Sequence, residues 1–275
     1  MNEIAAGVFQ SHVPGATLPP YKGTECYWVG SPGEVILVDS GDGSDRACAT
    51  LEDDWTRLGR PHVRAIYASH FHPDHTGGGN WAHKRWAAPL YLHQKDIEAM
   101  VRRGKPSGLW QHHETGRFTI GGLQVTLMEA PGHTPGQWNF WLPNSRGLLA
   151  GDNVLGDSTV VIVPPDGELH QYLNTLAKLQ ALNPSWIGPG HGTLVREPAA
   201  YLAYYASHRE ERSQEILRLL ERGVRTPEAI ASVIYADKLT ADTMHLGMWM
   251  VKGHLQHLLA LRQVAVDKGI YERKF

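Results

Sequence analysis

The chain of 275 residues contains little cysteine and no long apolar run. The two cysteines, Cys26 and Cys48, are too few for a disulfide framework and lack the paired spacing of a thiolate zinc site, so we expect two small buried side chains. Nowhere do about eighteen apolar residues follow one another, and residues 1–15 do not resemble a secretory signal. These absences predict a soluble, cytoplasmic protein without a membrane partner.

A strong charge of one sign is also missing. The sequence has 26 Lys and Arg residues against 28 Asp and Glu residues, a formal net charge of −2. The chain as a whole therefore exerts no strong attraction on nucleic acid or on an anionic membrane, although this balance leaves room for a local basic patch. A hydrophobic share of 42% over this length can bury a full-sized core and supply a second, smaller domain.

Histidine is the exception in an otherwise average composition. The chain has 16 histidines, where roughly six or seven would be ordinary for this length. Neutral imidazole is the commonest side-chain ligand of metals, so the excess favours a metal site. Most of the histidines need not be ligands. We expect His93, His112 and His113 on the surface, and His245, His254 and His257 packed or exposed on a C-terminal helix.

Apolar strands alternate with helices over the first two thirds of the chain. Two strands over residues 26–38 meet at the Ser31-Pro32-Gly33 turn, a helix follows over residues 44–59, and a buried strand follows over residues 63–68. Further strands are predicted over residues 90–93, 118–120, 124–129, 138–142, 147–150 and 186–188, a helix over residues 169–182, and a surface loop over residues 102–116. The order strand, helix, strand predicts a layered α/β domain.

The pattern becomes helical after Glu197-Pro198. Helices are predicted over residues 199–221, from Thr226-Pro227-Glu228 onward, and over residues 241–266. We therefore predict a catalytic α/β domain over residues 1–197 and a small helical domain over residues 198–275. The sequence does not determine an oligomeric state, but one apolar cluster fits either the core of the helical domain or a homodimer contact: Leu246, Met248, Trp249 and Met250.

The candidate chemistry is concentrated in the segment His70-Phe71-His72-Pro73-Asp74-His75, directly after the strand over residues 63–68. Alternate residues of an extended chain point to the same side, so His70 and His72 can reach one ion. As the chain turns into a helix, Asp74 and His75 can point into the same cavity from the other side. Imidazole and carboxylate ligands without thiolate suit zinc, and also iron or manganese, in a site with open coordination positions.

Three further candidate ligands each stand in a short loop after an apolar strand. Glycine lets such loops turn tightly and approach one another, so several strand ends can supply ligands at one edge of a sheet. The seven residues together predict a centre for two divalent ions. The three loops are Pro131-Gly132-His133-Thr134, Gly151-Asp152-Asn153 and Gly188-Pro189-Gly190-His191-Gly192, with His133, Asp152 and His191 as the ligands.

The same residues match the motif of a known family. The sequence resembles the metallo-β-lactamase superfamily, whose His-x-His-x-Asp-His motif is matched by residues 70–75. The resemblance implies an α/β fold of the αββα sandwich type with the metals at one sheet edge. Carried over residue by residue, it implies a first ion held by His70, His72 and His133, a second held by Asp74, His75 and His191, and a bridge between them at Asp152.

The sequence resembles one branch of this superfamily in particular, the lactamase-beta-like hydrolases that carry a small helical, winged-helix-like C-terminal domain. The segments that match this branch include residues 188–192, Tyr204, His208-Arg209 and Ile234-Tyr235. Cys26 stands where related chains often have Asn, and Trp138 and Trp249 are further departures. These differences concern substrate preference and not metal binding.

The predicted centre points to a metal-dependent hydrolase. A hydroxide that bridges two divalent ions is available at neutral pH, because metals lower the pKa of bound water from about 15.7 toward 7. We expect zinc, with iron and manganese as alternatives. Asp74 is the candidate catalytic residue, which beyond binding a metal could orient the hydroxide and pass its proton to the leaving group. Asp39 is expected either to orient a ligand histidine or to shape its turn, and His170 and Tyr172 are candidates for substrate contact.

The sequence leaves open which bond is cleaved. An ester-like bond in a thioester, a lactone, a β-lactam or a phosphodiester fits the predicted centre, and a small-molecule substrate is expected. One alternative is cleavage of single-stranded RNA, an activity within the resembling branch that basic residues of the tail would support: Arg218, Arg222, Lys252 and Arg262. Another is a sulfur dioxygenase with a single iron ion, although seven candidate ligands favour two ions. The last is a nucleic-acid-binding module whose metal centre is only a scaffold.

Overall fold

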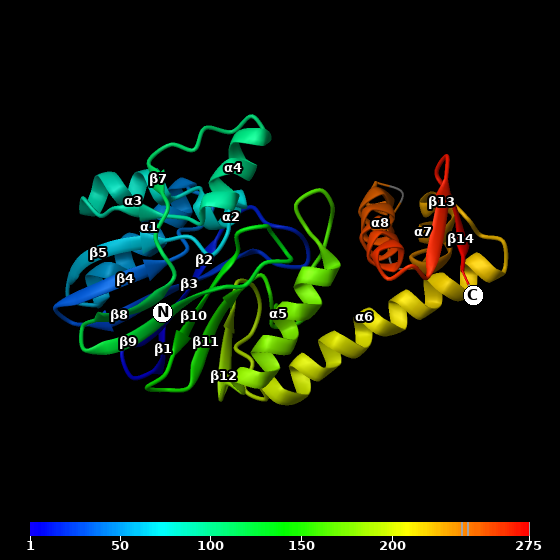
Figure 1. Ribbon diagram of the computed structural model, residues 1–275. Coiled ribbons are helices and arrows are strands. Elements are labelled where there is room, and N and C mark those ends of the chain that lie inside the picture. Colours follow the sequence, from blue (N-terminus) through cyan, green and yellow to red (C-terminus); the bar gives the residue numbers. More distant parts are fainter. Residues whose placement is uncertain (238, 241, 275) are drawn as a thin grey trace.

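Two β-sheets packed face to face form the centre of the molecule, and helices cover both outer faces (Figure 1). The computed structural model describes residues 1–237, 239–240 and 242–274. The first sheet has the strand order β1-β2-β3-β4-β5-β6-β7, and the second has the order β12-β11-β10-β9-β8. This αββα arrangement confirms the predicted α/β fold.

The first sheet and the helices beside it come from the N-terminal part of the chain. Its strands are β1 (Asn2–Ala5), β2 (Val8–Pro14), β3 (Gly23–Ser31), β4 (Glu34–Val38), β5 (His62–Tyr67), β6 (Leu90–Tyr91) and β7 (Trp110–Gln111). The helices are α1 (Asp45–Arg57), α2 (Pro73–Thr76), α3 (Gly79–Trp86) and α4 (Gln94–Arg102). Helix α1 begins where Ser44 Oγ accepts a hydrogen bond from the amide of Ala47, which satisfies a free helix-end donor. Strands β1 and β2 and helices α3 and α4 were not predicted, and β7 lies within the predicted surface loop.

The second sheet and helix α5 come from the middle of the chain. The strands are β8 (Gly116–Ile120), β9 (Leu123–Glu129), β10 (Trp138–Leu142), β11 (Gly147–Gly151) and β12 (Trp186–Pro189), and the helix is α5 (Leu169–Leu182). All five strands and the helix were predicted, with ends that differ by at most a few residues. Strand β11 is buried throughout because the first sheet covers one of its faces and helix α5 covers the other, so its residues are apolar without alternation.

Three apolar layers hold the sandwich together. Side chains of both sheets, among them Tyr27 from β3 and Trp138 from β10, form the layer between the sheets. The outer face of the first sheet packs against α1, α3 and α4, with Trp28 and Leu51 in that layer. The outer face of the second sheet packs against α5 and α6, with Tyr172 and Tyr205 in that layer. The middle layer excludes water from the facing sides of both sheets, and each outer layer does so for one outer face. This burial of apolar surface is the main favourable term in folding.

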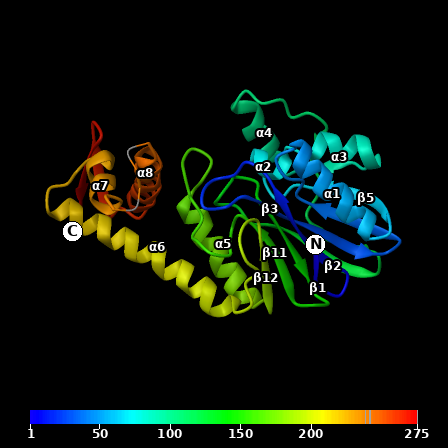
Figure 2. The same ribbon diagram turned by 180° about the vertical axis from the view of Figure 1, so that it is seen from behind.

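The C-terminal part lies to one side of the sandwich and has its own apolar core (Figures 1 and 2). Its elements are α6 (Pro198–Glu221), α7 (Pro227–Ile234), α8 (Met244–Ala260), β13 (Val264–Asp267) and β14 (Ile270–Arg273). The prediction of a helix up to residue 266 was wrong at its C-terminal end, because α8 ends at Ala260 and a β-hairpin follows; Ala241, its predicted start, lies outside the described residues. The boundary after residue 197 and the winged-helix-like character stay predictions. No helix among the described residues is both long and apolar enough to cross a membrane.

The topology brings strand ends from both sheets to one edge of the sandwich. Strands β4 and β5 are parallel, and so are β11 and β12, so the C-terminal ends of each pair lie together. The segments that follow β5, β9, β11 and β12 carry the seven predicted ligands, and Asp39 follows β4. Residues that are up to 121 positions apart in the sequence, such as His70 and His191, can therefore meet at this edge.

Candidate metal centre

Four of the predicted ligands form one group. His70 and His72 follow β5, His133 follows β9 and Asp152 follows β11, and the ligand atoms of all four lie within 4.8 Å of one another. His70 Nε2 lies 2.8 Å from His72 Nδ1, and His133 Nε2 lies 3.1 Å from the same atom. His70 and His72 thus share one group, as expected, although the chain bends over residues 69–71 and is not extended there.

The other three predicted ligands form a second group. Asp74 and His75 belong to the short helix α2, and His191 follows β12. His191 Nε2 lies 3.2 Å from both His75 Nε2 and Asp74 Oδ2. The ligand atoms of Asp74 and His75, on helix α2, lie beside that of His191, so a single loop contributes to both groups.

Asp152 lies between the two groups and presents one oxygen to each. Its Oδ2 lies 3.7 Å from His133 Nε2 and 4.0 Å from His70 Nε2. Its Oδ1 lies 3.5 Å from Nε2 of both His75 and His191. One carboxylate is therefore shared by two sets of imidazoles, which is the arrangement expected of a residue that bridges two ions.

Backbone carbonyls hold the far side of two predicted ligand rings. His133 Nδ1 lies 3.0 Å from the carbonyl oxygen of Val161, and His191 Nδ1 lies 2.8 Å from that of Gly23. A carbonyl oxygen can only accept, so both Nδ1 atoms donate a proton. In a neutral ring the Nε2 atom then carries the lone pair that faces the group.

Asp39 holds the far side of a third ring. His75 Nδ1 donates to Asp39 Oδ2 at 2.8 Å, and Asp39 also accepts hydrogen bonds from the amide and hydroxyl of Ser69. Of the two roles considered from the sequence, orienting a ligand histidine is thus the one that the structure shows. Ser69 and Asp39 also join the end of β4 to the start of the ligand loop.

Burial keeps the imidazoles of the first group neutral. Loss of solvent lowers the pKa of His70 and His72 well below the usual value, and the neighbouring histidines lower it further. Loss of solvent also lowers the pKa of His133, although Asp152 opposes this effect. Neutral imidazole is the form that binds metals, so these side chains are ready to do so at neutral pH.

The second group has a negative environment. Burial lowers the pKa of His75, but the carboxylates of Asp39, Asp152 and Asp74 outweigh burial and raise this pKa to about 10. For Asp74, burial raises the pKa, but His75 and His191 outweigh it and the net pKa is lowered. Three carboxylates thus surround one buried ring, and a divalent cation can balance their charge as a proton does.

The donor atoms fit two metal ions. Asp152 Oδ1 is buried and has no hydrogen-bond partner, although a buried carboxylate oxygen normally has one. The ring nitrogens in both groups face one another at 2.8–3.2 Å, close enough for several of them to contact one cation. Nitrogen and oxygen donors without sulfur suit zinc as well as iron and manganese. Among the described residues, two groups of His, Cys, Asp or Glu can hold a metal, and they are these.

Gly190 allows the loop after β12 to approach the centre. A Cβ atom at this position would lie 2.2 Å from Asp152 Oδ1 and 2.9 Å from His75 Cε1, both far inside van der Waals contact. The close approach in turn places the next residue, His191, against the second group. Glycine is therefore required here by proximity, as was expected of the glycines beside the candidate ligands.

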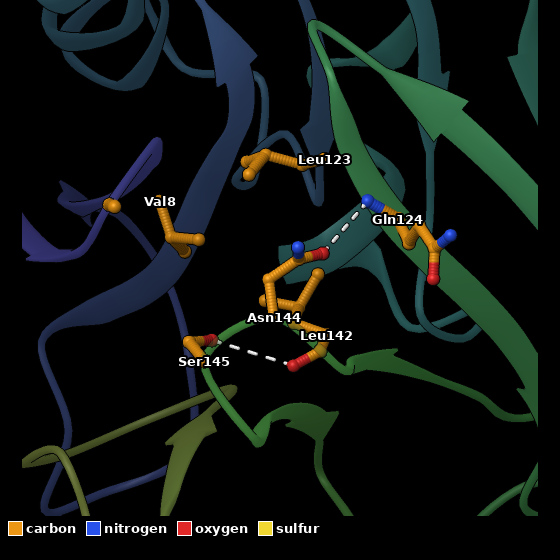
Figure 3. A pocket seen from close by; sticks show the side chains of 7 residues that line it. Val8, Leu123, Gln124, Leu142, Asn144 and Ser145 are labelled. Atoms are coloured by element: carbon orange, nitrogen blue, oxygen red, sulfur yellow. Dashed lines mark hydrogen bonds between the residues drawn. The ribbon is translucent and has the colours of Figure 1, made fainter.

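A cavity of about 460 Å³ opens over both groups. Five predicted ligands lie at its base, and the walls come from residues 16–21, between β2 and β3, and from residues 155–161, after β11. Figure 3 shows a different, smaller cavity, lined by Val8, Leu123, Leu142 and their neighbours. Its lining, all within the described part of the chain, includes no histidine and no acidic residue, so it is not part of the metal centre.

Some expectations for individual residues were wrong. His93 was expected on the surface but is 6% exposed, and its Nδ1 accepts a hydrogen bond from the amide of Lys95 at the start of α4. Tyr172 is fully buried, and its hydroxyl donates to the carbonyl oxygen of Asn153, so it supports the fold. His170 is exposed and, like Tyr172, is not among the residues that line the cavity over the metal centre.

Two residues near the centre were not identified from the sequence. Thr17 Oγ1 donates a hydrogen bond of 2.8 Å to Asp74 Oδ2, and Thr17 lies in the cavity wall. Asp96, in the first turn of α4, is fully buried and connects two ligand loops. It accepts hydrogen bonds from the amides of Phe71 and Gly136 and from the Thr134 hydroxyl. Neither residue belongs to a ligand motif, so only the tertiary contacts show their roles.

Comparison with known proteins agrees with this geometry. Residues 21–191, which contain all seven predicted ligands, match the model of the metallo-beta-lactamase superfamily. The chain belongs to this superfamily. Its fold and its hydrolase-named relatives identify it as a metallohydrolase, with His and Asp groups suited to two metal ions.

Several known proteins are similar to this chain in sequence. It is 29% identical to a beta-lactamase-like protein 2 homolog of Caenorhabditis elegans over 222 residues, which are 78% of this chain and 72% of that protein. It is 30% identical to a lactamase-like protein of Penicillium aethiopicum over 207 residues, 75% of this chain and 63% of that one. It is 27% identical to an atrochrysone carboxyl ACP thioesterase of Emericella nidulans over 206 residues, 73% and 62% of the two chains. These matches span less than two thirds of the two fungal proteins.

Solved structures share the fold over nearly the whole chain. A metallo-beta-lactamase family protein from Thermus thermophilus has a TM-score of 0.82 at 21% identity, covering 99% of this chain and all of its own. A beta-lactamase domain protein from Burkholderia ambifaria also has a TM-score of 0.82, at 20% identity and over 99% and 93% of the two chains. Coverage of 99% includes the C-terminal helices, so the whole architecture recurs.

Proposed function

We propose that this superfamily member hydrolyses an ester-like bond at a centre of two divalent ions, with zinc as the preferred metal. The observation that carries the proposal is the shared carboxylate of Asp152, whose two oxygens face two separate sets of imidazoles. The first ion would be held by His70, His72 and His133 and the second by Asp74, His75 and His191, with Asp152 as the bridge.

Two such ions would supply a nucleophile at neutral pH by lowering the pKa of water, and would stabilise negative charge on the substrate carbonyl. The chain itself fixes the geometry. Val161 and Gly23 hold the rings of His133 and His191 through their carbonyl oxygens, and Asp39 holds that of His75. Rings held in this way lose little freedom on binding a metal.

Asp74 is proposed to move a proton as well as to bind a metal. Its side chain is 17% exposed and lies at the base of the cavity, so it can contact both water and substrate. Thr17 donates to Asp74 Oδ2 and fixes the orientation of the carboxylate. In this arrangement Asp74 would accept a proton from the attacking water and return it to the leaving group.

The candidate bonds are those of thioesters, lactones, β-lactams and phosphodiesters. The similarity to a fungal protein named as an acyl carrier protein thioesterase supports a carbonyl substrate, with a thioester first. Cleavage of single-stranded RNA is the second candidate. It is supported by exposed basic residues in the C-terminal part, namely Arg218, Arg222 and Arg262.

The proposal is tested by metal analysis together with a substrate screen. The purified full chain, loaded with zinc, should hold two ions per chain and should hydrolyse one of the four ester-like classes. One iron per chain together with oxidation of a sulfur substrate would overturn the hydrolytic mechanism in favour of a dioxygenase. Turnover of RNA in preference to all carbonyl substrates would favour the second candidate.

His72→Ala provides the matched test of the metal centre. This variant should lose at least about 100-fold in hydrolysis and should bind fewer ions per chain, whereas His112→Ala, at an exposed histidine, should behave as the unsubstituted chain. If His72→Ala abolishes hydrolysis and leaves RNA binding unchanged, a nucleic-acid-binding module with a scaffold metal is excluded. If hydrolysis persists undiminished, the proposed centre is wrong.

A further inference from the structure

The walls of the cavity over the metal centre are apolar. On one side stand Leu18, Pro19 and Tyr21, and on the other Leu155, Val160 and Val161. Leu18 is 55% exposed at the cavity edge, whereas Val160 is 2% exposed and belongs to the core below. Leu18 thus presents apolar surface to solvent at the cavity edge, where an apolar ligand can cover it.

Apart from the two metal ions proposed at its base, the cavity offers no positive charge to an anionic substrate. Among the described residues that line it, none is Lys or Arg, and the acidic ones, Asp74 and Asp152, are predicted metal ligands. A phosphodiester chain or a substrate carboxylate bound along the walls would lose water without gaining a counter-charge. Apolar groups would gain free energy by leaving water in the same place.

We propose that this cavity binds an uncharged, apolar acyl group, so that the substrate is a thioester or ester of a hydrophobic acid. Binding of the acyl group is argued from the residues that line the cavity alone, whereas cleavage of its ester bond rests on the proposed function. In the reaction, water adds to the carbonyl carbon and the bond from this carbon to sulfur or oxygen breaks. One proton of the water leaves with the thiol or alcohol, and the other is released from the new carboxylic acid.

Helix α6 of the C-terminal part holds one of these walls. Tyr201, Tyr205 and Arg209 are spaced four residues apart and therefore share one face of α6. The hydroxyl of Tyr205 accepts a hydrogen bond from the amide of Leu155 at 2.9 Å and lies against the carbonyl oxygen of Ser158. The hydroxyl of Tyr201 lies within hydrogen-bonding distance of the carbonyl oxygens of Leu155 and Gly156.

Arg209 connects the wall to a predicted metal ligand. It is 5% exposed, lies over the ring of Tyr172, and donates from Nη2 to the carbonyl oxygen of Val160. The carbonyl oxygen of the next residue, Val161, accepts the hydrogen bond from His133 Nδ1. One arginine of α6 thus holds the apolar wall one peptide before the carbonyl group that orients His133. We assign Arg209 as a positioning residue for the acyl cavity.

The first experiment measures binding without chemistry. The full chain, stripped of metal with a chelator, is titrated by calorimetry with two uncharged ketones that cannot be hydrolysed, 2-pentanone and 2-decanone. Each methylene buried in an apolar site is expected to strengthen binding about fourfold, so 2-decanone should bind at least tenfold more tightly. Equal affinity for the two ketones would overturn the proposed cavity.

A wall variant tests where this binding occurs. Leu18→Asp, at an exposed position, should reduce 2-decanone binding at least tenfold without affecting the fold. The control is Val233→Asp, at a 55% exposed valine of α7, which should bind as the unsubstituted chain does. If Leu18→Asp and the control bind 2-decanone equally well, the ligand lies elsewhere and the proposal fails.

The second experiment measures specificity on the zinc-loaded chain. Over acyl thioesters from acetyl to decanoyl, kcat/KM should rise about fourfold per methylene until the cavity is filled. Hydrolysis at a rate independent of chain length, or preference for RNA, would overturn the acyl cavity while leaving the metallohydrolase intact. Chain-length-dependent ketone binding without hydrolysis of any ester would support the cavity and overturn the proposed function.

Arg209 variants separate positioning from folding. Arg209→Met should flatten the chain-length profile and weaken the binding of one zinc ion at least tenfold, with unchanged circular dichroism. Arg209→Lys, which can still donate to the Val160 carbonyl, should restore part of both properties. Arg218→Met, at an exposed arginine of the same helix, is the control. If Arg209→Met keeps the zinc affinities and the chain-length profile of the unsubstituted chain, Arg209 has no positioning role.

Discussion

The carboxylate of Asp39 lies 2.8 Å from Nδ1 of His75, on the side of the ring that faces away from the predicted ligand atom Nε2. The same carboxylate accepts the amide hydrogen of Ser69 at 2.7 Å and its hydroxyl hydrogen at 2.9 Å. Asp39 therefore connects strand β4 to the loop that starts the metal centre. Such outer contacts set the orientation and basicity of a ligand ring.

Asp39→Asn should weaken metal binding more than it weakens the fold. The amide nitrogen of asparagine cannot accept a hydrogen bond, so either the bond from His75 or one from Ser69 will be lost. Loss of an outer contact of this kind typically reduces metal affinity about 10-fold to 100-fold. In a calorimetric titration with zinc, one of the two binding steps should weaken by this factor.

The control for this prediction is Asp53→Asn, an exposed aspartate of α1. It should leave both zinc-binding steps unchanged. If Asp39→Asn binds zinc with the same two affinities as the unsubstituted chain, then Asp39 supports only its turn.

The strand-end position of the ligands explains why most of the centre could be predicted. His70 and His72 follow a strand that its apolar residues identify, and both belong to one group of ligand atoms. The roles of Asp39 and Asp96 were harder to predict from the sequence. Each residue bonds to a partner that lies 25 or more positions away along the chain. Local patterns identify candidate ligands, but the partners that orient them depend on how strands and helices pack.

Gly190→Ala should disrupt the centre while the fold survives. The added Cβ would lie 2.2 Å from Asp152 Oδ1 and 2.9 Å from His75 Cε1. Either the loop after β12 or the carboxylate must move, and both belong to the proposed two-metal arrangement. We expect less than two zinc ions per chain by elemental analysis and a loss of hydrolysis of at least about tenfold.

Gly33→Ala is the matched change, because a Cβ at Gly33 meets no atom within 4 Å. Gly33 lies in the turn between β3 and β4, away from the predicted ligands. Full zinc content in both variants would show that the close approach of Gly190 is not needed for metal binding.

The C-terminal hairpin shows where periodicity misleads. Residues after Ala260 continue an apolar pattern that also fits a helix, and the prediction extended the helix to residue 266. The structure instead ends α8 at Ala260 and pairs β13 with β14 across a turn. Lys268 and Gly269 both have positive φ angles in this turn. Such angles match a tight hairpin turn, so the dipeptide Lys268-Gly269 was the overlooked signal.

Tyr205→Phe should destabilise the protein through the wall of the acyl cavity. The change keeps the ring but removes the hydroxyl that pairs with the buried amide of Leu155 and the carbonyl oxygen of Ser158. A buried polar group left without a partner costs about 1–3 kcal/mol. The free energy of unfolding in urea should fall by this amount.

The neighbouring tyrosine of α6 offers a control. Tyr204 is 54% exposed, so Tyr204→Phe should change the free energy of unfolding by no more than about 0.5 kcal/mol. An equal effect of the two substitutions would mean that the Tyr205 hydroxyl contributes nothing specific to the segment after β11.

His254 should make stability depend on pH below neutrality. Burial, together with the positive charges of Arg209 and Arg212 and of nearby His257 and His208, holds its pKa well below the usual value. In the unfolded chain the pKa is near 6.5, so below that pH the unfolded state binds a proton that the native state does not. Stability contributed by neutral His254 is therefore present above about pH 6.5 and lost as the pH falls below it.

His254→Asn removes this titration and keeps a side-chain acceptor near the hydroxyl of Ser213, which lies 3.0 Å from Nδ1 of the histidine. Between about pH 7.5 and pH 5.5 the unsubstituted chain should lose about 1 kcal/mol more unfolding free energy than this variant. Other histidines titrate in both proteins, so their effects cancel in the comparison. His245→Asn, at an exposed histidine of α8, should retain the full pH dependence. Parallel pH profiles for the unsubstituted chain and His254→Asn would show that burial of His254 does not set the acid sensitivity of the C-terminal part.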